Sequence, residues 1–138
     1  MSRRKARILA FQGLYSWDVG NIAKEDVLEL NWADFANETE VEETKTFARL
    51  LIAGTIENHE KIDSLIKAHL SPKWDFERLN KVSLSVLRMG VYSLLYQKEL
   101  SSSIVIDEAI SITKNFGQDD SHRFVNAVLD AIRKELAA

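Results

Sequence analysis

Apolar residues recur every three or four positions along most of the chain, which is the spacing of one face of an α-helix. Near the start of the chain this spacing predicts a helix that ends at about Asp18. Its apolar stripe consists of Ala6, Leu9, Ala10, Gly13 and Trp17. We expect this stripe to face the core.

The middle of the chain has the same periodicity, with interruptions. Residues 24–35 predict a short acidic helix followed by a loop. Residues 40–70 predict a long helical segment, either kinked near Gly54 or broken near Asn58. Pro72 then ends this segment, because proline cannot continue a helix.

The second half of the chain predicts three more helical features. The stretch from Leu79 to Leu94 is so apolar that we expect a central, mostly buried helix. Serines within 101–103 can cap the next helix, which Gly117 ends. A side chain within 119–121 can cap the last helix. Its apolar set is Phe124, Val125, Val128, Leu129, Ile132 and Leu136. The pattern predicts an all-α fold of six or seven helices.

Composition agrees with this fold class and excludes several kinds of protein. The chain has 138 residues, a single-domain size, with one proline and five glycines to interrupt helices. It has no cysteine, which excludes disulfides, thiolate zinc sites and a cysteine nucleophile. Its apolar runs are far shorter than the roughly 20 residues that a membrane span needs. We therefore expect a cytoplasmic protein without a membrane segment.

Charge is unevenly distributed, although the net charge is only -3. Residues 1–17 hold four basic residues and no acidic ones, whereas residues 25–43 hold eight acidic residues and no basic ones. A polyanion could therefore meet the basic end locally while the acidic segment keeps other surfaces soluble or repels unwanted contacts.

The first helix has a second face that could bind such a polyanion. At about 100° per residue, Arg3, Arg4 and Arg7 fall within one quadrant, and Phe11 and Tyr15 continue that side. Arginines on one face can engage successive phosphates, and aromatic rings can stack on bases. The alternative is a solvated arginine cluster without a function, with both rings packed under a neighbouring element.

Motifs for catalysis or metal binding are missing from the sequence. The three histidines stand far apart, and there is no glycine-rich phosphate loop. The adjacent Asp120, Ser121 and His122 point in different directions from a helix start, so they cannot form a catalytic relay. Asp107 and Glu108 are interpreted as the acidic first turn of a helix. We expect no enzyme activity, metal or cofactor.

Two stretches of the chain carry the motifs of one known family. The first, RRKARILAFQGLYSWD, matches Arg-Arg-x-Ala-Arg followed by Ala-x-Gln-x-Leu-Tyr. The second, VSLSVLRMGVYSLLY followed by IVIDEAISITKNFGQDDSHRFVNAVLDAI, matches Leu-Arg, Glu-Ala, Lys-x-Phe-Gly and Ser-x-x-Phe-Val-Asn elements, in order and at the family spacing. Together they resemble the NusB family of bacterial transcription antitermination factors, and the resemblance covers both ends and the centre of the chain.

This resemblance implies a fold and a function. The fold would be a compact bundle of about seven helices in two small helical subdomains, with residues 1–138 forming one RNA-binding domain. The function would be to bind the boxA segment of ribosomal RNA leaders together with the ribosomal protein NusE. The complex would then help RNA polymerase to read through terminators.

The resemblance also implies roles for individual residues. Arg3, Arg4 and Arg7 match the family's arginine-rich RNA-binding start, and Phe11 and Tyr15 lie where a base or ribose could stack.

Further RNA contacts are implied at Lys114 and Phe116, which match Lys-x-Phe-Gly. Asp120 and Phe124 match the segment where RNA and the ribosomal protein meet the last helix. The partner surface would also include Ser83. A phenylalanine on an apolar stripe is equally compatible with a core position, so both interpretations of Phe124 stay open.

Three positions depart from the family pattern. Ser83 stands where an acidic residue associated with the protein partner is usual, so a charged contact would be absent or replaced. Ile8 stands where many members have glutamate, which leaves the first helix less balanced in charge. Ala127 replaces a common glycine, and we expect it to alter only packing.

Two other functions stay open at this stage. The same helical domain forms the RNA-binding part of a ribosomal RNA cytosine methyltransferase, so the chain could be a stand-alone relative of that domain. It could also be a self-associating RNA-binding regulator whose homodimer covers the basic helix.

Overall fold

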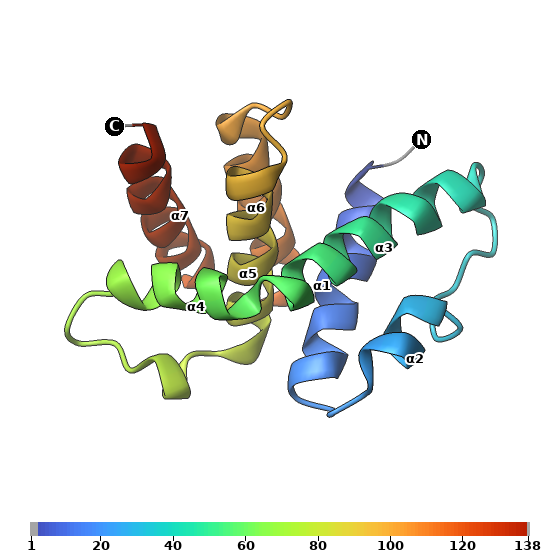
Figure 1. Ribbon diagram of the computed structural model, residues 1–138, viewed down its shortest axis with the longest axis horizontal. Coiled ribbons are helices and arrows are strands. Elements are labelled where there is room, and N and C mark those ends of the chain that lie inside the picture. The colour runs from blue at the N-terminus through green and yellow to red at the C-terminus, as the bar shows by residue number, and fades with distance from the viewer. Residues whose placement is uncertain (1–2, 138) are drawn as a thin grey trace.

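The computed structural model describes residues 3–137, so the two ends of the expected domain, residues 1–2 and 138, lie outside the described residues. Within that range the chain forms seven α-helices, one short 3₁₀ helix and no strand, which confirms the all-α prediction. The elements are α1 (Arg3–Asp18), α2 (Lys24–Glu29), α3 (Val41–Glu57), α4 (His59–Ala68), η1 (Phe76–Arg78), α5 (Lys81–Tyr96), α6 (Ser102–Phe116) and α7 (Ser121–Ala137) (Figure 1).

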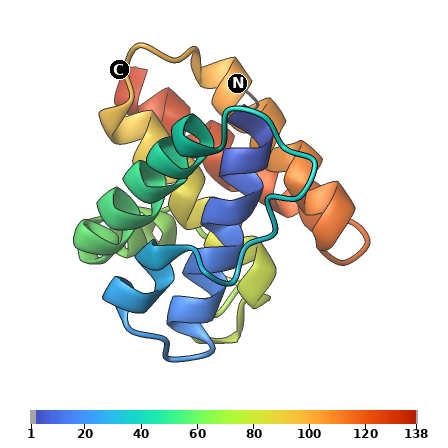
Figure 2. The same cartoon turned by 90° about the vertical axis from the view of Figure 1, so that its right-hand side faces the viewer.

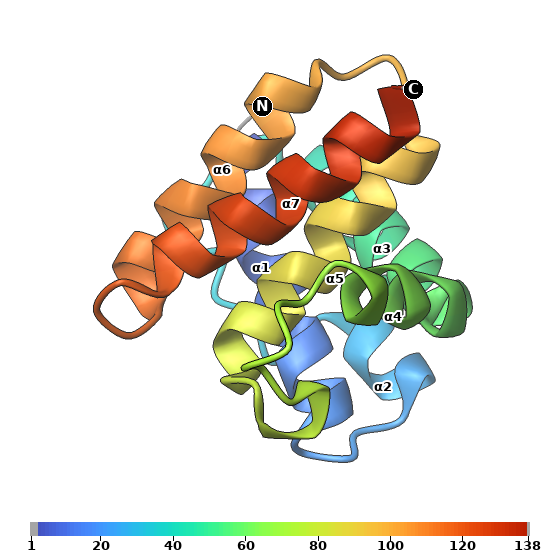
Figure 3. The ribbon, with the colours of Figure 1, turned by 90° about the vertical axis from the view of Figure 1, so that its left-hand side faces the viewer.

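Two groups of helices share α5. Helices α1, α2 and α3 pack together, and α5, α6 and α7 pack together. Helix α5 also contacts α1, α3 and α4, so it belongs to the core of both groups. Figure 3 shows α7 lying across α5 and α6. The strongly apolar stretch is thus a central buried helix, as its pattern predicted.

The long periodic segment is broken at Asn58, one of the two expected positions. Helix α3 ends at Glu57 and α4 begins at His59. The Asn58 side chain donates a hydrogen bond to the carbonyl oxygen of Gly54 (2.8 Å) and accepts one from the Tyr96 hydroxyl (3.2 Å). Gly54 lies inside α3, where a Cβ atom would overlap the ring of Tyr92. Close helix packing, rather than a kink, explains this glycine.

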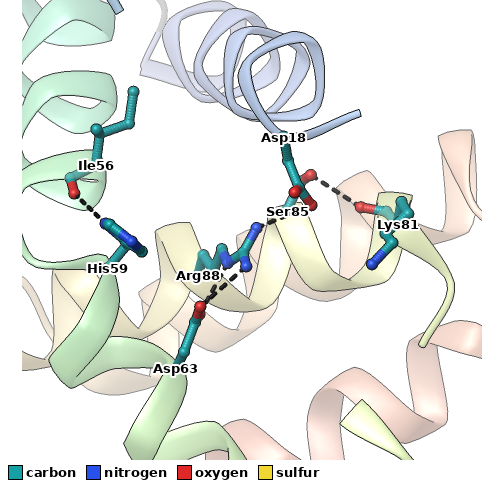
Figure 4. Close-up of polar contacts among 7 residues, drawn as sticks. All are labelled: Asp18, Ile56, His59, Asp63, Lys81, Ser85 and Arg88. Atoms are coloured by element: carbon teal, nitrogen blue, oxygen red, sulfur yellow. Dashed lines mark hydrogen bonds and ion pairs between the residues drawn. The ribbon is translucent and has the colours of Figure 1, made fainter. Parts of the chain in front are cut away.

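A buried ion cluster joins three helices. Arg88 on α5 donates two hydrogen bonds to Asp63 on α4, Nε to Oδ1 at 2.8 Å and Nη2 to Oδ2 at 3.0 Å. Its Nη1 donates to Oδ2 of Asp18 at the end of α1, also at 3.0 Å (Figure 4). Burial opposes the charged form of Arg88, but the bonds and charges of Asp63 and Asp18 outweigh it and raise the pKa of the guanidinium.

Within residues 3–137, no helix is both long and apolar enough to cross a membrane.

Replacing Arg88 with methionine should lower the free energy of unfolding by about 3 kcal/mol, because two poorly exposed carboxylates would then have no cationic partner. Urea denaturation measures this change. The matched control is Arg133→Ala, which breaks a more exposed pair with Asp130 and should cost less than about 1 kcal/mol. Equal losses in the two variants would contradict a special role for the Arg88 cluster.

Candidate nucleic-acid interface

The basic face of α1 is held in place by side chains from other helices. Arg4 is exposed and donates Nε to Oε2 of Glu108 at 3.1 Å and Nη2 to Oε1 at 3.2 Å. These bonds and the carboxylate charge raise the pKa of Arg4. Glu108 lies well inside α6, which begins at Ser102, so its interpretation as an acidic first turn was wrong. The pair connects α1 to a residue 104 positions away in sequence.

Arg3 and Arg7 both face the ring of Phe47 on α3. The guanidinium carbon of Arg3 lies 4.0 Å from the ring centroid, and that of Arg7 lies 5.6 Å from it. Arg3 is exposed, whereas only 8% of Arg7 is accessible, so the expected row of three exposed arginines is in fact two exposed and one buried. Packing of α3 against α1 causes this burial.

Arg7 is electrostatically unusual. Its side chain makes no hydrogen bond or ion pair with any residue in 3–137. Burial lowers its pKa, as do the charges of Arg3 and Arg4, while the charge of Glu108 opposes the shift. A buried cation without a hydrogen-bonded anion is costly, and it is the kind of group that an incoming phosphate would stabilise.

An aromatic hollow of about 280 Å³ follows the basic face along α1. Tyr15 and Phe116 are its exposed rings, and 44% of Phe116 is accessible. Phe11 is buried and packs under Phe116 with ring centroids 5.2 Å apart, so it supports that ring instead of presenting its own face. Lys114 is exposed on the last turn of α6. The structure therefore brings Phe116 on α6 together with Phe11 and Tyr15 on α1.

A second groove, of about 620 Å³, lies between the loop before α5 and the start of α7. Phe124 lines it half-buried, with its ring centroid 4.7 Å from that of Trp74. Trp74 is 44% exposed and was missed by the sequence analysis, although a tryptophan beside Lys73 in a proline-containing loop was a visible signal. Asp120 is exposed at the same groove, directly before α7, with a left-handed backbone (φ 66°).

Ser83 also lines this groove but is only 2% exposed. Its backbone N–H donates to the Asn80 side chain, which caps α5 (3.1 Å). Its hydroxyl has no hydrogen-bond partner among the described residues. Ser83 is therefore a buried residue of the groove wall, not an exposed counterpart of the family's acidic residue.

The acidic segment lies against the basic face. Figure 2 shows the chain between α2 and α3 passing across α1. Glu38 in this segment forms an ion pair with Lys5 at 3.8 Å, and Glu42 and Glu43 line a hollow with Arg3. We expected the acidic segment to serve other surfaces, but it adjoins the basic end of the chain. Its negative charges therefore limit the width of the basic face.

These features define a class of protein. The described part of the chain is all-α and contains no cluster of three or more acidic or histidine side chains able to hold a metal ion. It carries exposed arginines on one helix, beside a hollow with exposed aromatic rings. This combination is typical of helical proteins that bind single-stranded nucleic acid.

Comparison with known proteins identifies the family. The sequence model of the NusB family matches residues 4–134, so the chain belongs to the NusB family. The transcription antitermination protein NusB of Treponema denticola is 46% identical over 137 residues, covering 98% of both chains.

Solved structures agree. T. maritima NusB has a TM-score of 0.84 at 35% identity, covering 98% of this chain and 92% of that one. A chain in the crystal structure of the antitermination factors NusB and NusE in complex with dsRNA has a TM-score of 0.84 at 28% identity, with 96% of both chains covered.

The buried charge of Arg7 should reduce the stability of the free protein. Arg7→Met keeps the length of the side chain but removes the buried charge, so the free energy of unfolding should rise by about 1 kcal/mol. Urea denaturation measures it, with the exposed Arg78→Met as the control, which should change stability by less than about 0.5 kcal/mol. A destabilised Arg7→Met variant would show instead that the guanidinium supports the fold.

Proposed function

We propose that this chain is a transcription antitermination factor that acts in the cytoplasm on nascent ribosomal RNA. It binds the boxA segment of the leader together with the ribosomal protein NusE, and the complex promotes read-through by RNA polymerase. The observation that carries this proposal is the basic face of α1 beside an aromatic hollow, in a chain that aligns over nearly its whole length with antitermination proteins.

The RNA path runs along α1. Arg3 and Arg4 at the start of the helix contact phosphates, and Arg7 supplies a buried charge behind them. Further along the helix, Tyr15 and Phe116 offer ring faces on which a base can stack. Lys114 adds a cation at the end of α6, so the phosphate contacts extend past the hollow.

The protein partner binds the second groove. Phe124 and Trp74 provide a half-exposed aromatic pair, and buried aromatic side chains often dominate the binding energy of an interface. Asp120 stands at the edge of this groove, within reach of both the partner and the RNA beside α6. Binding of the partner in this groove would therefore bring it next to the RNA.

Adjacent residues of α5 separate the two surfaces. Val82 lines the aromatic hollow and Ser83 lines the partner groove. A partner in the groove and an RNA base in the hollow would therefore approach the same turn of α5 from two sides. This proximity supports binding of NusE and RNA as one unit.

Removal of the two exposed arginines tests RNA binding. The Arg3→Ala, Arg4→Ala double variant should bind boxA RNA more weakly, and the logarithmic salt dependence should flatten by about 0.7 for each phosphate that the variant no longer neutralises. Fluorescence titration over a series of salt concentrations measures both quantities.

The matched control removes two positive charges from the last turns of α7, Arg133→Ala with Lys134→Ala. It should leave affinity and slope nearly unchanged. If the two double variants behave alike, general charge and not the α1 face governs binding.

Two aromatic substitutions separate the partner surface from the RNA surface. Phe124→Asp should abolish NusE binding because it places a charge in an apolar contact, while Phe116→Asp should weaken RNA binding and spare NusE. Titration with each ligand measures the effects, and thermal melting checks the fold.

A Phe124→Asp variant that melts normally and binds NusE with unchanged affinity would refute the groove assignment. Early melting of that variant would instead support the interpretation of Phe124 as a packing residue against Trp74.

A further inference from the structure

Glu108 is the carboxylate of the described chain that hydrogen-bonds an arginine of the basic face. The proposed RNA function does not use it, and a carboxylate beside a phosphate-binding surface is unfavourable by charge alone. Its presence there therefore needs a physical explanation.

The geometry of the pair leaves Arg4 free to bind a second anion. An arginine has five N–H groups, and Glu108 accepts from the side edge formed by Nε and Nη2. The terminal edge, formed by Nη1 and the remaining hydrogen of Nη2, keeps its donors for a phosphate. The Arg4 side chain is 57% exposed and that of Glu108 only 19%, so the guanidinium lies outside and the carboxylate lies beneath it.

The same carboxylate moderates repulsion among the arginines. Arg3, Arg4 and Arg7 lie within about two turns of one helix, and the first two disfavour the charged form of Arg7. Glu108 acts on Arg4 through hydrogen bonds and on Arg7 through its charge. Without Glu108, the long Arg4 side chain would have no hydrogen-bonded anchor in the described residues, and repulsion would favour spread conformations.

We propose that Glu108 is a positioning residue for RNA binding, which holds the guanidinium of Arg4 so that its terminal edge faces the incoming phosphate. This inference rests on the proposed function, since it assumes that Arg4 contacts RNA. An ordered arginine loses less conformational entropy on binding than a mobile one. The gain from an ordered Arg4 outweighs the repulsion between Glu108 and the phosphate, because the Glu108 carboxylate lies on the far side of the guanidinium from the solvent.

The test is the sign of the effect of Glu108→Gln. This change removes a negative charge, so simple electrostatics predicts tighter RNA binding. Positioning predicts the opposite, an affinity for boxA RNA that is weaker by about three- to tenfold. Glu60→Gln, at an exposed position on α4, is the matched control for charge and should bind like the wild type or slightly more tightly.

A double-mutant cycle with Arg4→Ala shows whether Glu108 acts through Arg4. In the Arg4→Ala background, Glu108→Gln should no longer weaken binding, whereas a general structural role would weaken it in both backgrounds. Thermal melting of each variant checks that the fold is retained. Tighter or unchanged binding by Glu108→Gln, or equal weakening in both backgrounds, would overturn the proposal.

The cycle also separates this inference from the proposed function. If the wild type binds boxA RNA and Arg4→Ala weakens it, the RNA function stands whatever Glu108→Gln does. If Arg4→Ala has no effect, Arg4 does not contact RNA and the positioning role falls with that contact.

Discussion

The placement of α1 depends on the ion cluster of Arg88, Asp63 and Asp18. A guanidinium inside the protein requires its carboxylates at fixed distances, so the cluster fixes the end of α1 against α4 and α5. Both candidate surfaces depend on this arrangement. The aromatic hollow forms only where α1 meets α5 and α6, and the start of α5 also forms one wall of the groove beside α7.

At the other end of α1, contacts from other helices determine the exposure and orientation of the arginine side chains. Phe47 from α3 packs against two guanidinium groups, and Glu108 from α6 holds a third. An isolated peptide of this helix would carry the same arginines without these restraints. The basic face is therefore a property of the folded bundle, because helices distant in sequence determine which cations are exposed and how they are oriented.

Most of the fold, but only part of the candidate site, could be predicted from the sequence. Helical periodicity predicted the helices, and the break at Asn58 was one of its two alternatives, because local hydrogen bonding at an asparagine can be inferred from sequence. The burial of Arg7 could not be predicted, since it depends on how α3 crosses α1. Arg4 and Glu108 are 104 positions apart, and helical periodicity gives no information about contacts between residues so distant in sequence. Ser83 was predicted at the partner surface, but its burial was not, and Trp74 was missed, because loop packing forms the groove that both residues line.

The arginines at the start of α1 lie at the positive end of the helix dipole, and the first turn contains no acidic residue to offset them. Their mutual repulsion and the dipole both oppose folding of the free protein, and dissolved salt screens them. Under the proposed function, the same salt competes with RNA for the arginines. Ionic strength thus acts in opposite directions on the free protein and on its RNA complex. Added salt stabilises the free fold at this end of the helix and weakens the complex. Bound RNA in turn stabilises the fold by mass action.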